Sequence, residues 1–216
     1  MTWAIVLLAL AVALPVQQNA PHGRLFPPQD LGLLEMPDRD KWQKPDQIMD
    51  ALNIADGSAV ADTGAGAGWF TIRLARRVGP RGIVYAQDVQ REMLEAIRRR
   101  VAKEGLENVQ TRLGQGSDPN LPASSLDAVL VVDVYPEVEA DHRVRFLQNL
   151  TASLKPNGRI GIVNYKPGQG GPGPSSADEG LRVDASVVEQ DAATAGLRVL
   201  SRETFLPYQY LLVLGK

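Results

Sequence analysis

Hydrophobic and polar residues along positions 45–216 follow two different periods. Short apolar runs are typical of buried strands, and we expect strands at about 60–63, 83–86, 109–113, 128–134 and 159–165. Between these runs, apolar residues recur at helical spacing, as in Ile72, Ala75 and Val78. We expect helices from Pro45, after each of the first two strands, and at about 139–154 and 185–195.

The order of these elements predicts the fold class. Strands that alternate with helices require a parallel sheet with helices on both faces. Two further strands, at about 197–204 and 208–214, are joined near Leu206-Pro207 tightly enough to form an antiparallel pair. We therefore expect an α/β, Rossmann-like doubly wound sheet that is mostly parallel and ends in a C-terminal antiparallel hairpin.

Composition is typical of one packed domain with appendages. The 216 residues are 44% hydrophobic and 22% charged, with a formal net charge of -2. Because basic and aromatic residues do not gather in one stretch, no nucleic-acid partner is expected. The chain has no cysteine, which excludes disulfides and thiolate chemistry. His22 and His142 are far apart in the sequence, and no metal site is expected.

The N-terminal region divides into two predicted segments. Residues 3–14 form an apolar run of twelve within segment 1–20, which suits a signal peptide and is too short to span a bilayer. No Lys or Arg precedes the run. The alternative is a helix that packs on the domain or anchors it peripherally to a membrane. The expected location is therefore exported, periplasmic or membrane-anchored, if this is a signal, and cytoplasmic otherwise.

Segment 21–44 is rich in proline and is expected to lie as an arm across the main domain, 45–216. Arg39, Trp42 and Gln43 stand just before the first helix of that domain. They are expected either to form a lid over a ligand or, in the case of Trp42, to pack the arm down.

The stretch from Val60 to Thr71, VADTGAGAGWFT, carries the clearest sign of function. Two small apolar residues and Asp62 lead into glycines at alternate positions, and a helical pattern follows at once. Glycine adopts positive φ without strain and lets a backbone and a helix N-terminus approach a ligand closely. The stretch therefore predicts a strand, a tight turn and a helix that together hold a ligand.

Other polar residues are expected at the same edge of the sheet, because ligands of such folds bind beyond the carboxyl ends of the strands. Asp88 ends the second expected strand, 24 residues after Gly64, where an acid can accept hydrogen bonds from both hydroxyls of a ribose. Asp133 and Tyr135 end the fourth strand, and Tyr165 and Lys166 end the fifth. The ligand is expected to be a nucleoside derivative.

Glycine spacing separates two cofactor classes. A nicotinamide or flavin site uses G-x-G-x-x-G, but the bulky Trp69 stands three positions after Gly66. The motif is instead an acid, Asp62, followed by G-x-G-x-G. In this motif, and in LDAVLVVDVYPEV (126–138) and LKPNGRIGIV (154–163), the chain resembles the class I S-adenosylmethionine-dependent methyltransferases from about residue 45 to its end.

The resemblance implies S-adenosyl-L-methionine as the cofactor and assigns residues to it. Asp62 would help to bind its ammonium group, Asp88 its ribose, and the segment 114–122 its adenine. Relatives usually have an acid where Gln115 stands. The amide oxygen of Gln115 is an alternative acceptor for the adenine amino group, and Ser117 or Asp118 is the other candidate. The full set of implied cofactor-binding residues is Asp62, Gly64, Gly66, Gly68, Asp88, Gln115, Gly116 and Asp133.

Methyl transfer from a sulfonium to a small-molecule acceptor is an in-line displacement, in which alignment and exclusion of water supply most of the catalysis. A base matters only if the acceptor must lose a proton, and Asp133 and Tyr135 are the candidate catalytic residues. The alternative is that these two residues only cap the next helix and pack at the rim of the acceptor pocket. Relatives tend to carry His where Pro136 stands, which leaves open a catalytically silent cofactor-binding module. A nicotinamide-dependent oxidoreductase is the third reading, and the oligomeric state is open.

Related enzymes that methylate arsenic work through cysteines, which this chain lacks, so an arsenic acceptor is not expected. The sequence does not otherwise identify the methyl acceptor.

Overall fold

The computed structural model describes residues 37–168, 170–173 and 180–216. Its strands are β1 (Ala59–Thr63), β2 (Ile83–Asp88), β3 (Val109–Leu113), β4 (Leu126–Val132), β5 (Leu154–Tyr165), β6 (Arg198–Glu203) and β7 (Gln209–Gly215). They form one sheet in the order β3-β2-β1-β4-β5-β7-β6. β1 to β5 are parallel, and β7 is antiparallel to both β5 and β6. The predicted α/β fold with a C-terminal antiparallel hairpin is confirmed.

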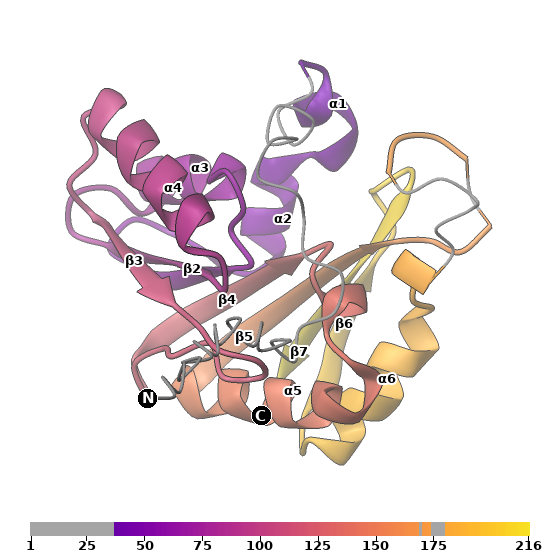
Figure 1. Cartoon of the computed structure of the whole chain (residues 1–216). Helices are drawn as coiled ribbons and strands as arrows, with labels where there is room; N and C mark the ends of the chain where they lie inside the picture. Colours follow the sequence, from indigo (N-terminus) through magenta and orange to yellow (C-terminus); the bar gives the residue numbers. More distant parts are fainter. Residues whose placement is uncertain (1–36, 169, 174–179) are drawn as a thin grey trace, which may run out of the picture.

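Helices cover both faces of this sheet (Figure 1). They are α1 (Arg39–Gln43), α2 (Pro45–Ala51), α3 (Trp69–Val78), α4 (Arg91–Lys103), α5 (Arg143–Ser153) and α6 (Ala185–Thr194). From β1 the chain moves through α3 to β2 and through α4 to β3, whereas β4 and β5 lie on the other side of β1. Since such crossovers are right-handed, the two directions put α3 and α4 on one face and α5 on the other.

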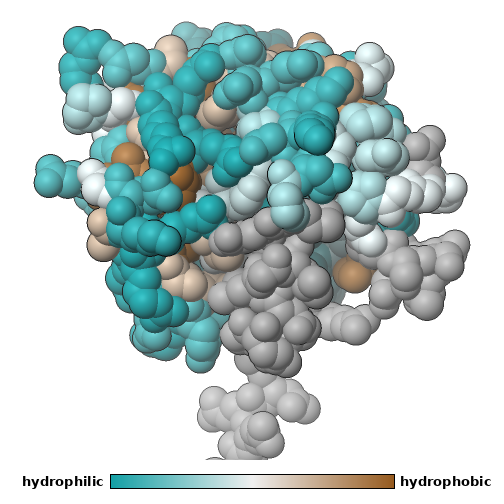
Figure 2. Space-filling model, turned by 90° about the horizontal axis from the view of Figure 1, so that it is seen from above, coloured by the Kyte–Doolittle hydropathy of each residue, from teal (hydrophilic) through white to brown (hydrophobic). Residues whose placement is uncertain are grey.

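Alternating residues of the central strands supply two separate hydrophobic layers. On β1, Val60 packs in the layer with α2 and α3, and its neighbour Ala61 packs in the layer with α5 and α6. On β4, Leu130 and Val131 divide in the same way. A strand covered on both faces has no water-exposed side, which explains why β4 is a continuous apolar run from Ala128 to Val132. The surface in Figure 2, in contrast, is mostly hydrophilic with small apolar patches.

Several predicted boundaries were wrong, among them the start of β4, which lies at Leu126 instead of 128, and three further ones. β4 ends at Val132 because Asp133 has a φ of 58°, which no strand residue adopts. The helix expected from residue 139 begins as separate 3-10 turns, η2 (Tyr135–Glu137) and η3 (Ala140–His142), and α5 starts only at Arg143.

The third boundary is the start of β5, which was expected at Arg159 and lies at Leu154. Leu126 pairs with Leu154 and Ala128 with Arg159, so β4 advances by two residues while β5 advances by five. Residues 155–158, which contain the turn-forming Pro156 and Gly158, bulge out of the ladder between these pairs. The sequence therefore correctly predicted a break at residues 155–158, but it did not predict that Leu154, just before the break, already pairs with β4.

The predictions for the signal or anchor segment, 3–14, and for most of the arm, 21–36, fall outside the described residues. Among the described helices, none is long and apolar enough to cross a bilayer.

The layered core predicts how leucine truncations differ. Leu130 is fully buried at the centre of β4, whereas Leu200 on the edge strand β6 is 43% exposed. We expect Leu130→Ala to lower the free energy of unfolding by about 2 to 5 kcal/mol, because it leaves a cavity in a packed layer. Leu200→Ala should cost less than about 1 kcal/mol. Urea titration followed by circular dichroism measures both, and equal losses would contradict the assigned layers.

Candidate functional site

The candidate site lies at the carboxyl edge of the sheet, where β1 and β4 are neighbours and the chain winds away from them in opposite directions. Thr63 of β1 is in register with Gln87 of β2 and with Val131 of β4. The loops that follow these three strands therefore leave the sheet side by side. This is the position at which open α/β sheets bind ligands.

The loop between β1 and α3 carries three glycines with left-handed backbone angles. The φ angle is 69° at Gly64, 52° at Gly66 and 81° at Gly68. A Cβ on Gly64 would lie 2.2 Å from a methyl carbon of Val134, so this loop packs closely against the segment after β4. Another residue at Gly64 would meet both backbone strain and a steric clash.

The side chain of Asp88 is fixed beside this loop. One of its carboxylate oxygens accepts a hydrogen bond from the backbone N–H of Gly66 at 2.9 Å, and the other accepts from the N–H of Gln90 at 3.0 Å. Asp88 is 6% exposed, and burial raises its pKa above the ordinary value despite these donors. The structure thus brings together the two features, glycine loop and acid, that the sequence assigned to one cofactor.

Asp62 points from β1 toward the first turns of α3. Its carboxylate accepts a hydrogen bond from the Thr71 hydroxyl at 2.6 Å and is almost completely buried. Burial raises the pKa of Asp62 to about 6, while Thr71 and the positive charge of Arg39 oppose that shift and Asp88 adds to it. Asp62 therefore contributes negative charge beneath the glycine loop and is held in place by α3.

Asp133 follows β4 in a left-handed conformation and is held by the last strand. The side-chain amide nitrogen of Gln209 donates to both carboxylate oxygens, at 2.9 and 2.8 Å. The amide oxygen of Gln209 accepts in turn from Gln43 at 3.0 Å. Burial raises the pKa of Asp133 to about 7, and Arg39, Gln209 and Gln43 oppose the rise. Asp133 is therefore poised to exchange a proton near neutral pH.

Glu137 belongs to the same group and was not singled out by the sequence. The pKa of its carboxyl is raised to about 8, mainly by burial and also by the negative charges of Asp88 and Asp133. Its position in the DVYPEV segment was a signal, but only the turn η2 brings it back toward Asp88.

Tyr135 lies elsewhere. It is fully buried in the layer formed with α5 and α6, and its hydroxyl donates a hydrogen bond to Asp191 of α6 at 2.6 Å. Burial is the main reason that its pKa lies well above the ordinary tyrosine value. The structure therefore gives Tyr135 the packing role that the sequence left as an alternative. It does not aim the hydroxyl at the glycine loop, and a proton-transfer role stays a prediction.

Gln115 and Gly116 lie in the loop between β3 and β4. Gln115 is exposed, and its backbone N–H and C=O exchange hydrogen bonds with Asp118 at 2.8 and 2.9 Å. Gly116 has a φ of 57°, and a Cβ there would meet no heavy atom within 4 Å. The assignment of both residues to an adenine pocket stays a prediction.

Trp42 in the arm packs against the domain. Its indole lies 6.1 Å from the ring of Tyr165 and 6.3 Å from that of Tyr208, measured between centroids, and it is 8% exposed. Trp42 was expected either to be part of a lid or to pack the arm down, and its observed contacts are those of packing. Gln43 on the same helix is completely buried, and its hydrogen bond to Gln209 ties the arm to the site.

One trio of ligand atoms in the described residues is close enough for a metal ion, within 4.8 Å of one another: those of Glu139, Asp141 and His142. Both acids are exposed, and Glu139 already contacts His142. Exposed acidic groups of this kind are common without a metal, and the trio lies in the turn before α5, so it carries no assignment.

The charges at the carboxyl edge restrict the kind of ligand that fits. The pKa values of Asp62, Asp88, Asp133 and Glu137 are all raised by burial, so ionised forms of these acids lack full solvation. A positively charged ligand stabilises such carboxylates, whereas the pyrophosphate of a dinucleotide is repelled by them. A nucleoside with a sulfonium and an ammonium group therefore fits the described residues better than a nicotinamide dinucleotide.

Comparisons with known proteins agree with this geometry. A family model described as a methyltransferase domain matches residues 60–158. The chain is similar to nocamycin O-methyltransferase of Saccharothrix syringae, with 32% identity over 68% of this chain and 53% of the relative. It is also similar to an arsenite methyltransferase of Halobacterium salinarum, with 35% identity over 50% of this chain and 27% of the relative. The chain thus spans about half or less of these relatives' lengths.

Among solved structures, the chain is similar to one described as a SAM-dependent methyltransferase from Aquifex aeolicus. The TM-score is 0.81 and the identity 26%, and the match covers 88% of this chain and 98% of the other. The match therefore extends over the sheet, both helix layers and the carboxyl edge.

The raised pKa of Asp133 predicts a pH-dependent cost of burying its charge. Between about pH 4 and pH 7 the folded chain holds a proton at Asp133 that the unfolded chain releases, so this group lowers the free energy of unfolding as pH rises. Asn cannot ionise and tolerates the left-handed backbone. We expect Asp133→Asn to be more stable relative to the native chain at pH 8 than at pH 5, by about 1 to 3 kcal/mol.

Urea titrations of the native chain and the variant at pH 5 and pH 8 measure this difference. All other titrating groups are the same in the two chains, so their contributions cancel in the comparison. A difference that is independent of pH would show that Asp133 is ionised at pH 5 and is not destabilised by burial.

Proposed function

Since the chain belongs to the class I S-adenosylmethionine-dependent methyltransferase family, we propose that it moves the methyl group of S-adenosylmethionine to a small-molecule acceptor. One observation carries the proposal most strongly. The glycine loop after β1 is hydrogen-bonded, through the N–H of Gly66, to the acid that ends β2, and buried acids surround both. A glycine backbone that a ligand can approach closely, a ribose acceptor and negative charge are the three features that suit a sulfonium nucleoside.

The residues present divide the cofactor among them. The backbone at Gly64 to Gly68 would lie against the methionyl part, and Asp88 would accept hydrogen bonds from the ribose hydroxyls. Asp62 and Asp133 would attract its ammonium group. When bound, the cofactor supplies an electrophilic methyl group on a positively charged sulfur. The chain's part is to align the acceptor behind that methyl group and to exclude water, so no covalent nucleophile is required.

Asp133 is the residue that we assign to proton transfer, if the acceptor loses a proton as it attacks. Without ligand its pKa is about 7, and the positive charges of a bound cofactor would lower it, so its carboxyl would be ionised at neutral pH and able to take a proton from a hydroxyl or amine. Gln209 occupies one lone pair on each carboxylate oxygen and leaves the others available. The proton would therefore move to an oxygen atom whose position is fixed by β7.

The acceptor is proposed only as a small molecule. Relatives are named for methylation of different acceptors, including an arsenite methyltransferase, but this chain contains no cysteine to hold arsenic. The competing function is a silent cofactor-binding module, which would bind the cofactor at the same residues without transferring its methyl group. The acidic carboxyl edge and the bulk of Trp69 disfavour a nicotinamide-dependent oxidoreductase.

Turnover decides between an enzyme and a silent module. We expect the full chain, incubated with methyl-labelled S-adenosylmethionine and mixtures of phenols, amines and quinols, to release S-adenosylhomocysteine and to label at least one acceptor, as detected by mass spectrometry. Binding of the cofactor without product in any mixture would favour the silent module.

The ribose assignment predicts a loss of affinity at Asp88. We expect Asp88→Asn to weaken S-adenosylhomocysteine binding roughly 10- to 100-fold in calorimetry, because the variant loses the charge that strengthens two hydrogen bonds. Asn keeps an oxygen that can accept from Gly66, and circular dichroism checks that the fold survives. Asp141→Asn, which removes an exposed acid, is the matched control and should leave affinity unchanged. Equal affinity in both variants would refute the ribose role.

A further inference from the structure

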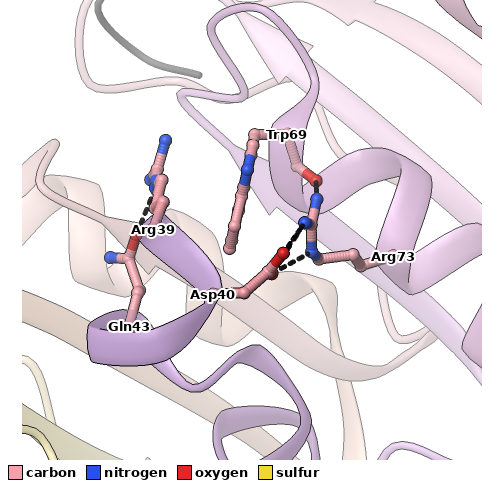
Figure 3. Close-up of polar contacts among 5 residues, drawn as sticks. All are labelled: Arg39, Asp40, Gln43, Trp69 and Arg73. Atoms are coloured by element: carbon pink, nitrogen blue, oxygen red, sulfur yellow. Dashed lines mark hydrogen bonds and ion pairs between the residues drawn. The ribbon is translucent and has the colours of Figure 1, made fainter. Parts of the chain in front are cut away.

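Helix α1 is attached to the domain at three places around the site, and Figure 3 shows the first of them, between Asp40 and Arg73. Asp40 forms a two-pronged ion pair with Arg73 of α3, with N to O distances of 2.7, 2.9 and 3.0 Å. Gln43 donates to Gln209, and the ammonium group of Lys44 donates to the backbone carbonyl of Phe205 at 2.8 Å. A five-residue helix is not stable alone, so these attachments fix where its side chains point.

The attachments place Arg39 of α1 on the indole of Trp69, the residue that follows the glycine loop. The guanidinium carbon of Arg39 lies 4.3 Å from the ring centroid, and that of Arg73 lies 3.6 Å from it. Figure 3 shows the two guanidinium groups on opposite sides of the indole. Stacking of this kind holds the planar group in one orientation and leaves its edge able to donate hydrogen bonds.

The two arginines differ in what they face. Arg73 pairs with the exposed Asp40. Arg39 donates through Nε to the amide oxygen of Gln43. Burial and the nearby charge of Arg73 lower the pKa of Arg39, whereas Asp133, Tyr165 and Asp62 act to raise it. Arg39 therefore presents its charge to the acids of the site, while Arg73 holds the helix.

The charges of the proposed cofactor require such a group. Its sulfonium and ammonium groups suit buried acids, but its carboxylate is repelled by them and needs a cation. The carboxylate and ammonium groups are bonded to the same carbon, so their partners must be neighbours. Arg39 and Asp133 meet this condition, because each lies near enough for its charge to act on the other. Hydrogen bonds through Gln43 and Gln209 also link the two side chains.

We propose that Arg39 binds the carboxylate of the cofactor's methionyl group and that α1 is thereby part of the cofactor site. This inference rests on the proposed function. The same helix then contributes to the binding of both charged groups of the methionyl part. Arg39 contacts the cofactor's carboxylate. Gln43, through Gln209, fixes the side chain of Asp133, which attracts the cofactor's ammonium group. An arginine that only fastened α1 to Trp69 would affect every ligand of the site alike.

Two ligands separate these roles. S-adenosylhomocysteine carries the amino acid group, whereas 5′-methylthioadenosine keeps the adenine, ribose and thioether and lacks the carboxylate. We expect Arg39→Gln in the full chain to weaken S-adenosylhomocysteine binding roughly 10- to 100-fold in calorimetry and to change 5′-methylthioadenosine binding less than about 3-fold. Arg39→Lys, which keeps the charge and loses the fork, should fall between the native chain and Arg39→Gln.

Lys41→Gln is the matched control, because it removes one positive charge from an exposed position of the same helix. It should change neither affinity. If Arg39→Gln lowers the affinity for both ligands equally, or for neither, the proposal is overturned. Arg39→Lys provides the same comparison if the Gln variant does not fold. A native chain that binds neither ligand would instead refute the proposed function, and this inference with it.

Discussion

Burial of negative charge at one edge of the sheet is the constraint on which the site depends. Four carboxyl groups meet where β1, β2 and β4 end, and burial raises the pKa of each: Asp62, Asp88, Asp133 and Glu137. Isolated carboxylates in such surroundings are costly, so neighbouring groups donate hydrogen bonds to them. A hydroxyl from α3, backbone N–H groups after β1 and β2, and an amide from β7 do so here.

The winding of the chain makes this arrangement possible. The chain leaves β1 and β4 toward opposite sides of the sheet, and the loops that follow these two strands meet at its carboxyl edge, where Gly64 packs closely against Val134. The antiparallel strand β7 then brings Gln209 to the same edge from the C-terminal region. A cationic nucleoside compensates the charge that the protein itself compensates only in part, which explains how one edge can both disfavour dinucleotides and favour a sulfonium.

The sequence predicted those parts of the fold and site that depend on local pattern. The periods of the apolar residues, the glycine spacing and the position of Asp88 needed only neighbours in the chain. Tyr135 was harder, because the left-handed turn at Asp133 redirects the chain and sends its side chain to the opposite face. Gln209 could not be assigned to the site, and Arg39 was expected only as part of a lid, since their contacts join segments far apart in the sequence.

The most direct test of the central claim is a calorimetric comparison of S-adenosylmethionine and NADH as ligands of the full chain at pH 8, where Asp62 and Asp133 are mostly ionised. The account predicts measurable binding of S-adenosylmethionine, weakening as pH falls toward 6 and Asp133 becomes protonated, and no measurable binding of NADH. Binding of NADH without binding of S-adenosylmethionine would contradict it.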